Sequence, residues 1–247
     1  MYRFFVEANQ IAEDEIIIIG TDVNHIKNVL RMVVGDKLMV SGQDDKEYTC
    51  YIKDFAGDEI VLSVVNVEEV DVELKSKIYL FQGLPKGDKM ELIVQKAVEL
   101  GAFEIIPVAM KNCVVKLDKK KAESKVKRWQ GIATSAAKQA KRMIIPKVTA
   151  PMSFAEAITY AEALDVKLMP YEKAVDMKAT MTFLNEIESG QLIGVFIGPE
   201  GGFDQTEVTL AEQSGIKPIT LGKRILRTET AGITTLSILM FLISQKT

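Results

Sequence analysis

The sequence predicts a small β-rich domain followed by a larger α/β domain. Residues 1–70 contain five short strand-like runs, and short strands that close on themselves suggest a small barrel. From residue 71 on, apolar strand-like runs alternate with helical stretches, which predicts a parallel sheet with helices on both faces. Two glycine-bearing loops near the C-terminus each follow such a run directly, and open α/β sheets bind ligands at this edge.

One helix is expected among the strands of residues 1–70. It spans roughly Asp22–Arg31, with Thr21 as its N-cap. The turn at residues 56–58 joins the last two strands as a hairpin, and the charged stretch Glu68–Ser76 is expected to be a linker. The predicted strands are Tyr2–Val6, Glu15–Ile19, Lys37–Gly42, Glu47–Phe55 and Glu59–Val67.

The remaining chain carries clear helix-end signals. Gly101 occupies a C′ position, Ser153 is a cap, and Asp204 with Glu207 three residues later resembles a capping box. The expected strands are Lys77–Gln82, Glu104–Ala109, Val166–Pro170, Leu192–Ile197 and Lys217–Thr220. The expected helices are Asp88–Leu100, Lys119–Lys141, Phe154–Leu164, part of Ala174–Glu188, Asp204–Gln213 and about Glu229–Ser244.

The two late loops carry the strongest indication of a binding site. The first is Gly198-Pro199-Glu200-Gly201-Gly202-Phe203, and the second runs from Leu221 to Ala231. Their glycines allow the backbone to approach a ligand closely, although glycines also suit a tight strand-to-helix turn. Thr228 in the second loop is either part of the site or an N-cap of the last helix.

Several classes of protein are excluded or disfavoured. No P-loop, no G-x-S-x-G elbow and no Cys/His pair occurs, and no G-x-G-x-x-G follows the first α/β strand. One histidine and two distant cysteines argue against a metal site. The longest apolar stretch, Ile233–Ile243, is too short to span a bilayer. Without an N-terminal signal, the chain is expected to be cytoplasmic.

The charge distribution is uneven. The net charge is −3, yet residues 111–147 hold twelve Lys and Arg against Asp118 and Glu123. Such a basic block indicates contact with a polyanion; the alternative is a solvated, lysine-rich helix face.

The motifs of the two late loops resemble those of a known family. Gly198-Pro199-Glu200-Gly201-Gly202, followed by Leu221-Gly222-x-Arg224-Ile225-Leu226-Arg227-Thr228-Glu229-Thr230-Ala231, is similar to the signature of the SPOUT RNA methyltransferases, and most similar to the RsmE-type 16S ribosomal RNA uridine N3-methyltransferases. Arg3-Phe4-Phe5, His25 and Val29-Leu30-Arg31 resemble that family's PUA-like barrel.

The resemblance implies a PUA-like RNA-binding barrel at residues 1–70 and a SPOUT domain with a C-terminal trefoil knot at residues 71–247. It also implies an S-adenosylmethionine cofactor, a homodimer, and 16S ribosomal RNA of the small ribosomal subunit as partner. The implied cofactor contacts are Leu168, Met169, Pro170, Ile197, Gly198, Glu200, Gly201, Gly202, Leu221, Gly222, Ile225, Leu226, Thr230 and Ala231.

The chemistry of uridine N3 then suggests roles for charged residues. Because its proton is only weakly acidic, the reaction needs a base or a group that stabilises the anion. Arg227 is the candidate for the second role, and Glu200 or Glu229 for proton removal, although Glu229 equally suits the first turn of a helix. The candidates for RNA contact are Arg3, Arg31, Lys120, Arg128, Lys138 and Arg142.

Two rival functions stay open. One is a related knotted enzyme that methylates a ribose 2′-oxygen or another base. The other is a non-catalytic RNA-binding assembly factor with the same fold.

Overall fold

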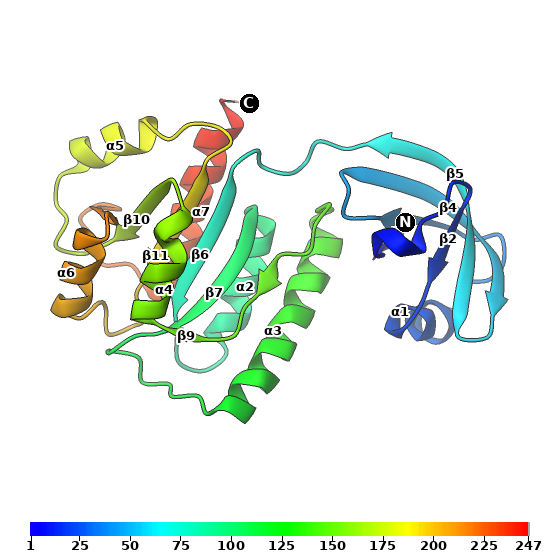
Figure 1. The fold of residues 1–247 in the computed structure, drawn as a ribbon, viewed down its shortest axis with the longest axis horizontal. Coiled ribbons are helices and arrows are strands. Elements are labelled where there is room, and N and C mark those ends of the chain that lie inside the picture. Colours follow the sequence, from blue (N-terminus) through cyan, green and yellow to red (C-terminus); the bar gives the residue numbers. More distant parts are fainter. Residues whose placement is uncertain (247) are drawn as a thin grey trace. The chain divides into compact units, whose positions relative to one another are not determined.

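A computed structural model describes residues 1–246 of the protein, which form two compact units. Unit 1 comprises Met1–Glu73 and Ala137–Ile145, and unit 2 comprises Leu74–Ala136 and the chain from Pro146 onward. Each unit is built on its own sheet (Figure 1).

Unit 1 contains the five strands that the sequence predicts. They pair in the order β1-β3-β4-β5-β2, antiparallel except for β1 with β3. Gly57, at φ 62°, makes the expected hairpin turn between β4 and β5. Closure of this sheet into a barrel stays a prediction. The strands are β1 (Arg3–Phe5), β2 (Glu15–Ile18), β3 (Lys37–Ser41), β4 (Lys46–Ala56) and β5 (Glu59–Glu69).

The helix of unit 1 differs from the prediction in its type and in its N-cap. A 3₁₀ turn, η1 (Ala8–Gln10), precedes it; then α1 (Thr21–Asn24) continues as a π-helical turn, η2 (His25–Val29). Thr21 as N-cap is wrong: the N-cap is Gly20 at φ 72°, a conformation that glycine adopts without a Cβ clash.

Residues 137–145 belong to unit 1 and are hydrogen-bonded to its strand β3 and to Glu73. The Ser41 hydroxyl donates to the carbonyl of Met143 (3.0 Å), and the Met143 amide donates to Glu73 (2.8 Å). The end of the long basic helix therefore belongs to unit 1 and not to the unit that contains its start.

Unit 2 has a seven-stranded sheet with the order β12-β10-β11-β6-β7-β8, and β9 also pairs with β7. All of its pairings are parallel, as predicted. The two-residue strands β8 and β9 were not expected, because two residues show no periodicity. The strands are β6 (Lys77–Gly83), β7 (Ala102–Ala109), β8 (Lys147–Val148), β9 (Met152–Ser153), β10 (Val166–Pro170), β11 (Leu192–Ile197) and β12 (Lys217–Ile219).

Helices cover both faces of this sheet (Figure 1). α2 and α7 pack side by side on one face, and α4 lies on the other. The cap at Ser153, the capping box at Asp204 and the C′ glycine Gly101 are confirmed, and Ser153 also forms a capping box with Glu156. The helices are α2 (Lys89–Glu99), α3 (Lys119–Gln139), α4 (Phe154–Tyr160) with the 3₁₀ turn η3 (Ala161–Ala163), α5 (Met177–Asn185), α6 (Gln205–Gln213) and α7 (Thr228–Ser244).

An aromatic cluster fixes the centre of the sheet. Phe81 on β6 and Phe196 on β11 are register partners whose rings stack at 4.3 Å, and Phe154 meets Phe196 edge-on at 6.2 Å. These buried rings pack together directly before the loop that follows β11.

Candidate functional site

A cleft of about 510 Å³ lies at the carboxyl edge of the parallel sheet in unit 2. The loops after β10, β11 and β12 meet there because parallel neighbours end at one edge. The cleft is lined by Lys89, Pro170–Glu172, Ile197–Phe203, Thr220–Gly222, Arg224–Thr228 and Ala231.

The loop after β11 is a tight turn that needs its glycines. Gly202 has φ 69°, and its amide donates to the Pro199 carbonyl at 2.9 Å. A Cβ at Gly83, the last residue of β6, would lie 2.7 Å from the backbone nitrogen of Pro199. The loop therefore lies directly on β6, and no side chain fits between them.

A buried hydroxyl joins this loop to the second one. Thr228 Oγ1 donates to the Gly198 carbonyl (2.6 Å) and accepts from Gln82 Nε2 (2.9 Å). Both side chains are buried. Thr228 as an N-cap is wrong, because the N-cap of α7 is Arg227 and Thr228 is the first helical residue.

Three charges gather at one end of the cleft. Lys89 Nζ lies 2.8 Å from Glu200 and 3.6 Å from Glu229, and the Lys86 amide also donates to Glu200. Partial burial raises the pKa of Glu200, but the hydrogen bonds from Lys89 and from backbone amides outweigh it and hold that pKa below its usual range. Glu200 is therefore an anion at neutral pH.

Most of the predicted cofactor residues meet in this cleft. Three do not line it: Leu168 and Met169 are fully buried within β10, and Thr230 is exposed on α7. Those that line it are Pro170, Ile197, Gly198, Glu200, Gly201, Gly202, Leu221, Gly222, Ile225, Leu226 and Ala231.

Of the catalytic candidates, Arg227 and Glu200 line the cleft and Glu229 does not. Arg227 is exposed, as is Arg224, which also lines the cleft. Sequence reasoning missed Lys89 and Gln82. Gln82 had a detectable signal, since it is a polar residue within an otherwise apolar strand.

The candidates for RNA contact fall in both units. In unit 1, Arg31 is exposed with φ 53°. Arg3 is paired with Glu47, and Lys138 is paired with Asp22. Arg142 is buried and paired with Glu73.

In unit 2, Arg128 is paired with Glu91. Lys120 is exposed and forms no ion pair within residues 1–246. The predicted basic block is divided between the units, because residues 137–145 belong to unit 1 and the rest to unit 2. Much of its charge is paired with carboxylates.

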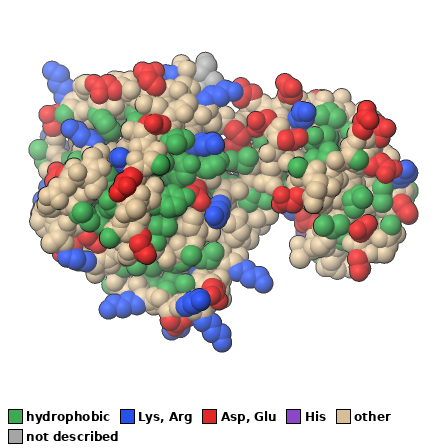
Figure 2. Space-filling model, in the orientation of Figure 1, with side chains coloured by type: hydrophobic (Ala, Val, Ile, Leu, Met, Phe, Trp, Pro, Cys, Tyr) green, Lys and Arg blue, Asp and Glu red, His purple; other side chains and the backbone are tan. Residues whose placement is uncertain are grey.

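A larger groove, of about 1470 Å³, lies between α3, α4 and α6. Figure 2 shows apolar side chains on the face that carries α3 and α4, with lysines around the start of α3. None of the predicted cofactor residues lines this groove, so we place the candidate site in the smaller cleft.

Within residues 1–246, no group of His, Cys, Asp and Glu could hold a metal ion, and no helix has the length and apolar composition of a membrane span.

Comparison with known families matches both parts of the chain. Residues 72–240 match the RNA methyltransferase domain family, and residues 18–65 match the RNA methyltransferase PUA domain family. The chain is 38% identical to ribosomal RNA small subunit methyltransferase E of Bacillus subtilis, over 98% of this chain and 96% of that protein. It is 35% identical to the enzyme of the same name from Mesomycoplasma hyopneumoniae, over 94% of this chain and 96% of that protein.

Solved structures agree over the whole length. A ribosomal RNA small subunit methyltransferase E from Neisseria gonorrhoeae bound to S-adenosyl methionine has a TM-score of 0.82 and 28% identity, with 98% of each chain covered. A putative methyltransferase from Legionella pneumophila in complex with the same cofactor has a TM-score of 0.86 and 31% identity, with 97% of each chain covered.

Proposed function

Because this chain belongs to the family of ribosomal RNA small subunit methyltransferases E, we propose that it transfers a methyl group from S-adenosylmethionine to N3 of a uridine in 16S ribosomal RNA. The observation that carries the proposal is the cleft itself. Two glycine loops meet there at the carboxyl edge of a parallel sheet, with the exposed Arg227 in its lining.

The residues present fit this cofactor. The cleft volume of about 510 Å³ falls in the usual range for small-ligand sites. Gly198, Gly201, Gly202 and Gly222 have no side chains, so a planar base can approach the backbone of both loops closely. Pro170, Ile197 and Leu226 supply apolar walls. Glu200 is an anion at this edge of the cleft, and its charge is offset by Lys89 at 2.8 Å. Bound S-adenosylmethionine supplies an electrophilic methyl group on a positively charged sulfur.

The protein's own residues then act on the uridine. Arg227 stabilises the negative charge that develops when the N3 proton leaves, since a fixed cation is most effective where charge appears. Glu200 or Glu229 assists proton removal. Glu200 lines the cleft but has a lowered pKa. Glu229 does not line the cleft and lies 3.6 Å from Lys89 Nζ, so variants of both carboxylates are needed to separate their roles.

We also propose a trefoil knot and a homodimer. After β12, at one end of the sheet, the chain returns to place α7 against β11 and α2, a path that a threaded C-terminal segment would take. Phe241 on α7 is 62% exposed and Leu92 on α2 is 43% exposed. A second copy covering this apolar face would bury both side chains.

Residues 1–70 are proposed as the RNA-binding domain and 71–247 as the methyltransferase domain, with 137–145 added to the former. Arg31 and Lys120, whose side chains are exposed, are the proposed RNA contacts; Arg3, Arg128, Lys138 and Arg142 are already paired with carboxylates. The enzyme is proposed to work in the cytoplasm without a metal ion.

The test is methylation of 30S particles with labelled S-adenosylmethionine, followed by nucleoside analysis. We expect 3-methyluridine, with and without EDTA. A 2′-O-methyl nucleoside in its place would support the ribose enzyme. RNA binding with neither cofactor binding nor methyl transfer would support the assembly factor.

A further inference from the structure

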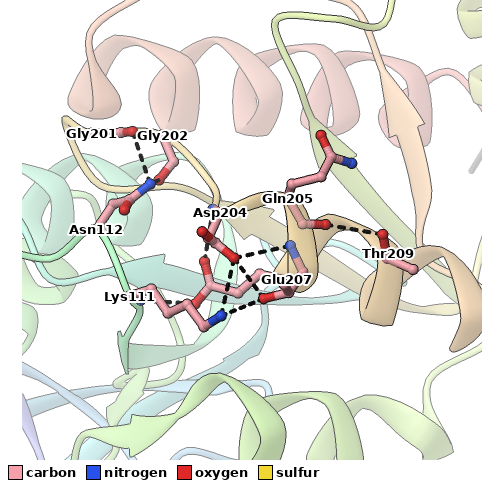
Figure 3. Close-up of polar contacts among 9 residues, drawn as sticks. Lys111, Asn112, Gly201, Gly202, Asp204, Gln205, Glu207 and Thr209 are labelled. Atoms are coloured by element: carbon pink, nitrogen blue, oxygen red, sulfur yellow. Dashed lines mark hydrogen bonds and ion pairs between the residues drawn. The ribbon is translucent and has the colours of Figure 1, made fainter.

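The segment Met110–Cys113 lies beside the first glycine loop (Figure 3). It follows β7 at the same edge of the sheet. Lys111 and Asn112 both point at residues of the loop or of the helix that follows it. Neither residue lines the cleft, so their contacts act on the loop and not on a ligand.

Asn112 holds the two central glycines. Its Nδ2 donates to the carbonyl oxygens of Gly201 and Gly202, both at 3.2 Å. A Cβ at Gly201 would lie 3.0 Å from the Cβ of Asn112 and 3.1 Å from its carbonyl oxygen. The two backbones are therefore in direct contact, and a side-chain amide is suited to this position because it offers two N–H groups.

Lys111 holds the far end of the same loop. Its backbone amide donates to Glu207 Oε1 (2.9 Å), while Glu207 Oε2 accepts from the Asp204 amide (3.0 Å). The ammonium group of Lys111 also lies 3.1 Å from Asp204 Oδ1. Since Asp204 is the N-cap of α6, Lys111 fixes the point at which the loop becomes a helix.

We infer that Lys111 and Asn112 form a clamp that holds residues 198–203 in the shape that binds the cofactor, with Asn112 as a positioning residue. The inference rests on the proposed function of the cleft. A loop with three glycines among six residues is costly to order. A clamp that orders it before binding removes that cost from the binding free energy.

The test is calorimetric titration of the full chain with S-adenosylmethionine. Asn112→Ala removes both hydrogen bonds, and we expect the dissociation constant to rise about fivefold. Asn112→Asp places an acceptor against two carbonyl oxygens, and we expect a rise of about tenfold or more. Asn112→Gln, which keeps the amide, should recover part of the affinity. The matched control is Asn185→Asp, an exposed position at the end of α5, which should bind as wild type does.

Kinetic and thermal-stability measurements distinguish a positioning role of Asn112 from a general loss of folding stability. We expect the KM for S-adenosylmethionine to rise in Asn112→Asp, with kcat at saturating cofactor unchanged. The thermal midpoint of the cofactor-free protein should fall only slightly, because the two lost hydrogen bonds are exposed. Wild-type affinity in Asn112→Asp overturns the inference, as does a loss of affinity that only parallels a lower midpoint. If wild type itself binds no S-adenosylmethionine, the proposed function fails and the inference fails with it.

Discussion

Arg227 is an exposed cation that lines the cleft, and its position makes a specific prediction. Its side chain is solvent-exposed and it forms no ion pair within residues 1–246. It is thus available to a substrate, unlike the paired Lys89. Removing one group that stabilises a developing anion typically costs about 100-fold or more in rate.

We therefore expect Arg227→Ala to lower kcat about 100-fold while the dissociation constant of S-adenosylmethionine changes less than about twofold. Single-turnover methylation of 30S particles and calorimetry measure the two quantities. Lys223→Ala, in the same loop but outside the cleft lining and exposed, is the matched control and should retain most of the rate. Full activity of Arg227→Ala would remove Arg227 from the mechanism.

Thr228 carries a second residue-scale prediction. Thr228→Val keeps the shape of the side chain but leaves the buried Gln82 amide and the Gly198 carbonyl without this partner. An unsatisfied buried polar group costs about 1–3 kcal/mol, so we expect the free energy of unfolding to fall by about 2 kcal/mol. Urea denaturation measures this. Thr230→Val, exposed two residues later, should stay within about 0.5 kcal/mol of wild type.

At the scale of elements, the start of α6 predicts a pH dependence. Hydrogen bonds from Thr206 and Lys111 lower the pKa of Asp204 from 3.8 to about 2. A carboxyl whose pKa is depressed on folding adds stability above its unfolded pKa, and that stability is lost as pH falls towards its folded pKa.

Asp204→Asn keeps a good N-cap but loses the charge. The difference in free energy of unfolding between wild type and this variant should be constant from pH 7 to about 5 and shrink below about pH 4. Urea titrations at pH 7, 5, 4 and 3 test this. A difference of the same size at pH 3 would contradict the assignment.

The apolar outer face of α7 predicts the dimer. Phe241→Glu places a charge where the proposed partner would pack, so we expect light scattering to show a monomer where wild type is a dimer. Met181→Glu on α5, which is 58% exposed in wild type, is the control and should leave the dimer intact. A wild-type monomer would remove the proposed interface.

Helices and strands could be predicted from the sequence where the pattern of apolar residues matches the burial of those residues in the structure. The bounds of β10 and β11 match the predictions because both are short and mostly apolar: β11 is almost wholly buried, and β10 contains the buried Leu168 and Met169. The two-residue strands β8 and β9 have no such pattern, and no local pattern distinguishes the π-helical turn His25–Val29 from an α-helix.

The site was predictable in part for the same reason. Glycines mark the loops locally, whereas Gln82, Lys89 and Asn112 act across separations of about a hundred residues. No pattern along the chain pairs Asn112 with Gly201. The contact arises only because β7 ends at the same edge of the sheet as β11.

At the scale of the whole molecule, RNA binding depends on where unpaired positive charge remains. The chain carries a net charge of −3, so attraction to phosphate must be local. Much of the basic block is neutralised within each unit, whereas Lys120 at the start of α3 is exposed and forms no ion pair within residues 1–246.

We expect Lys120→Ala to weaken binding to different 16S fragments by a similar factor and to reduce the slope of log affinity against log salt by about one, as the loss of one phosphate contact requires. Fluorescence anisotropy at several salt concentrations measures both quantities. Lys178→Ala, on the exposed side of α5, is the control and should leave the slope unchanged. Equal slopes for wild type and Lys120→Ala would mean that the start of α3 contacts no phosphate, and that the lysine-rich face of α3 is only solvated.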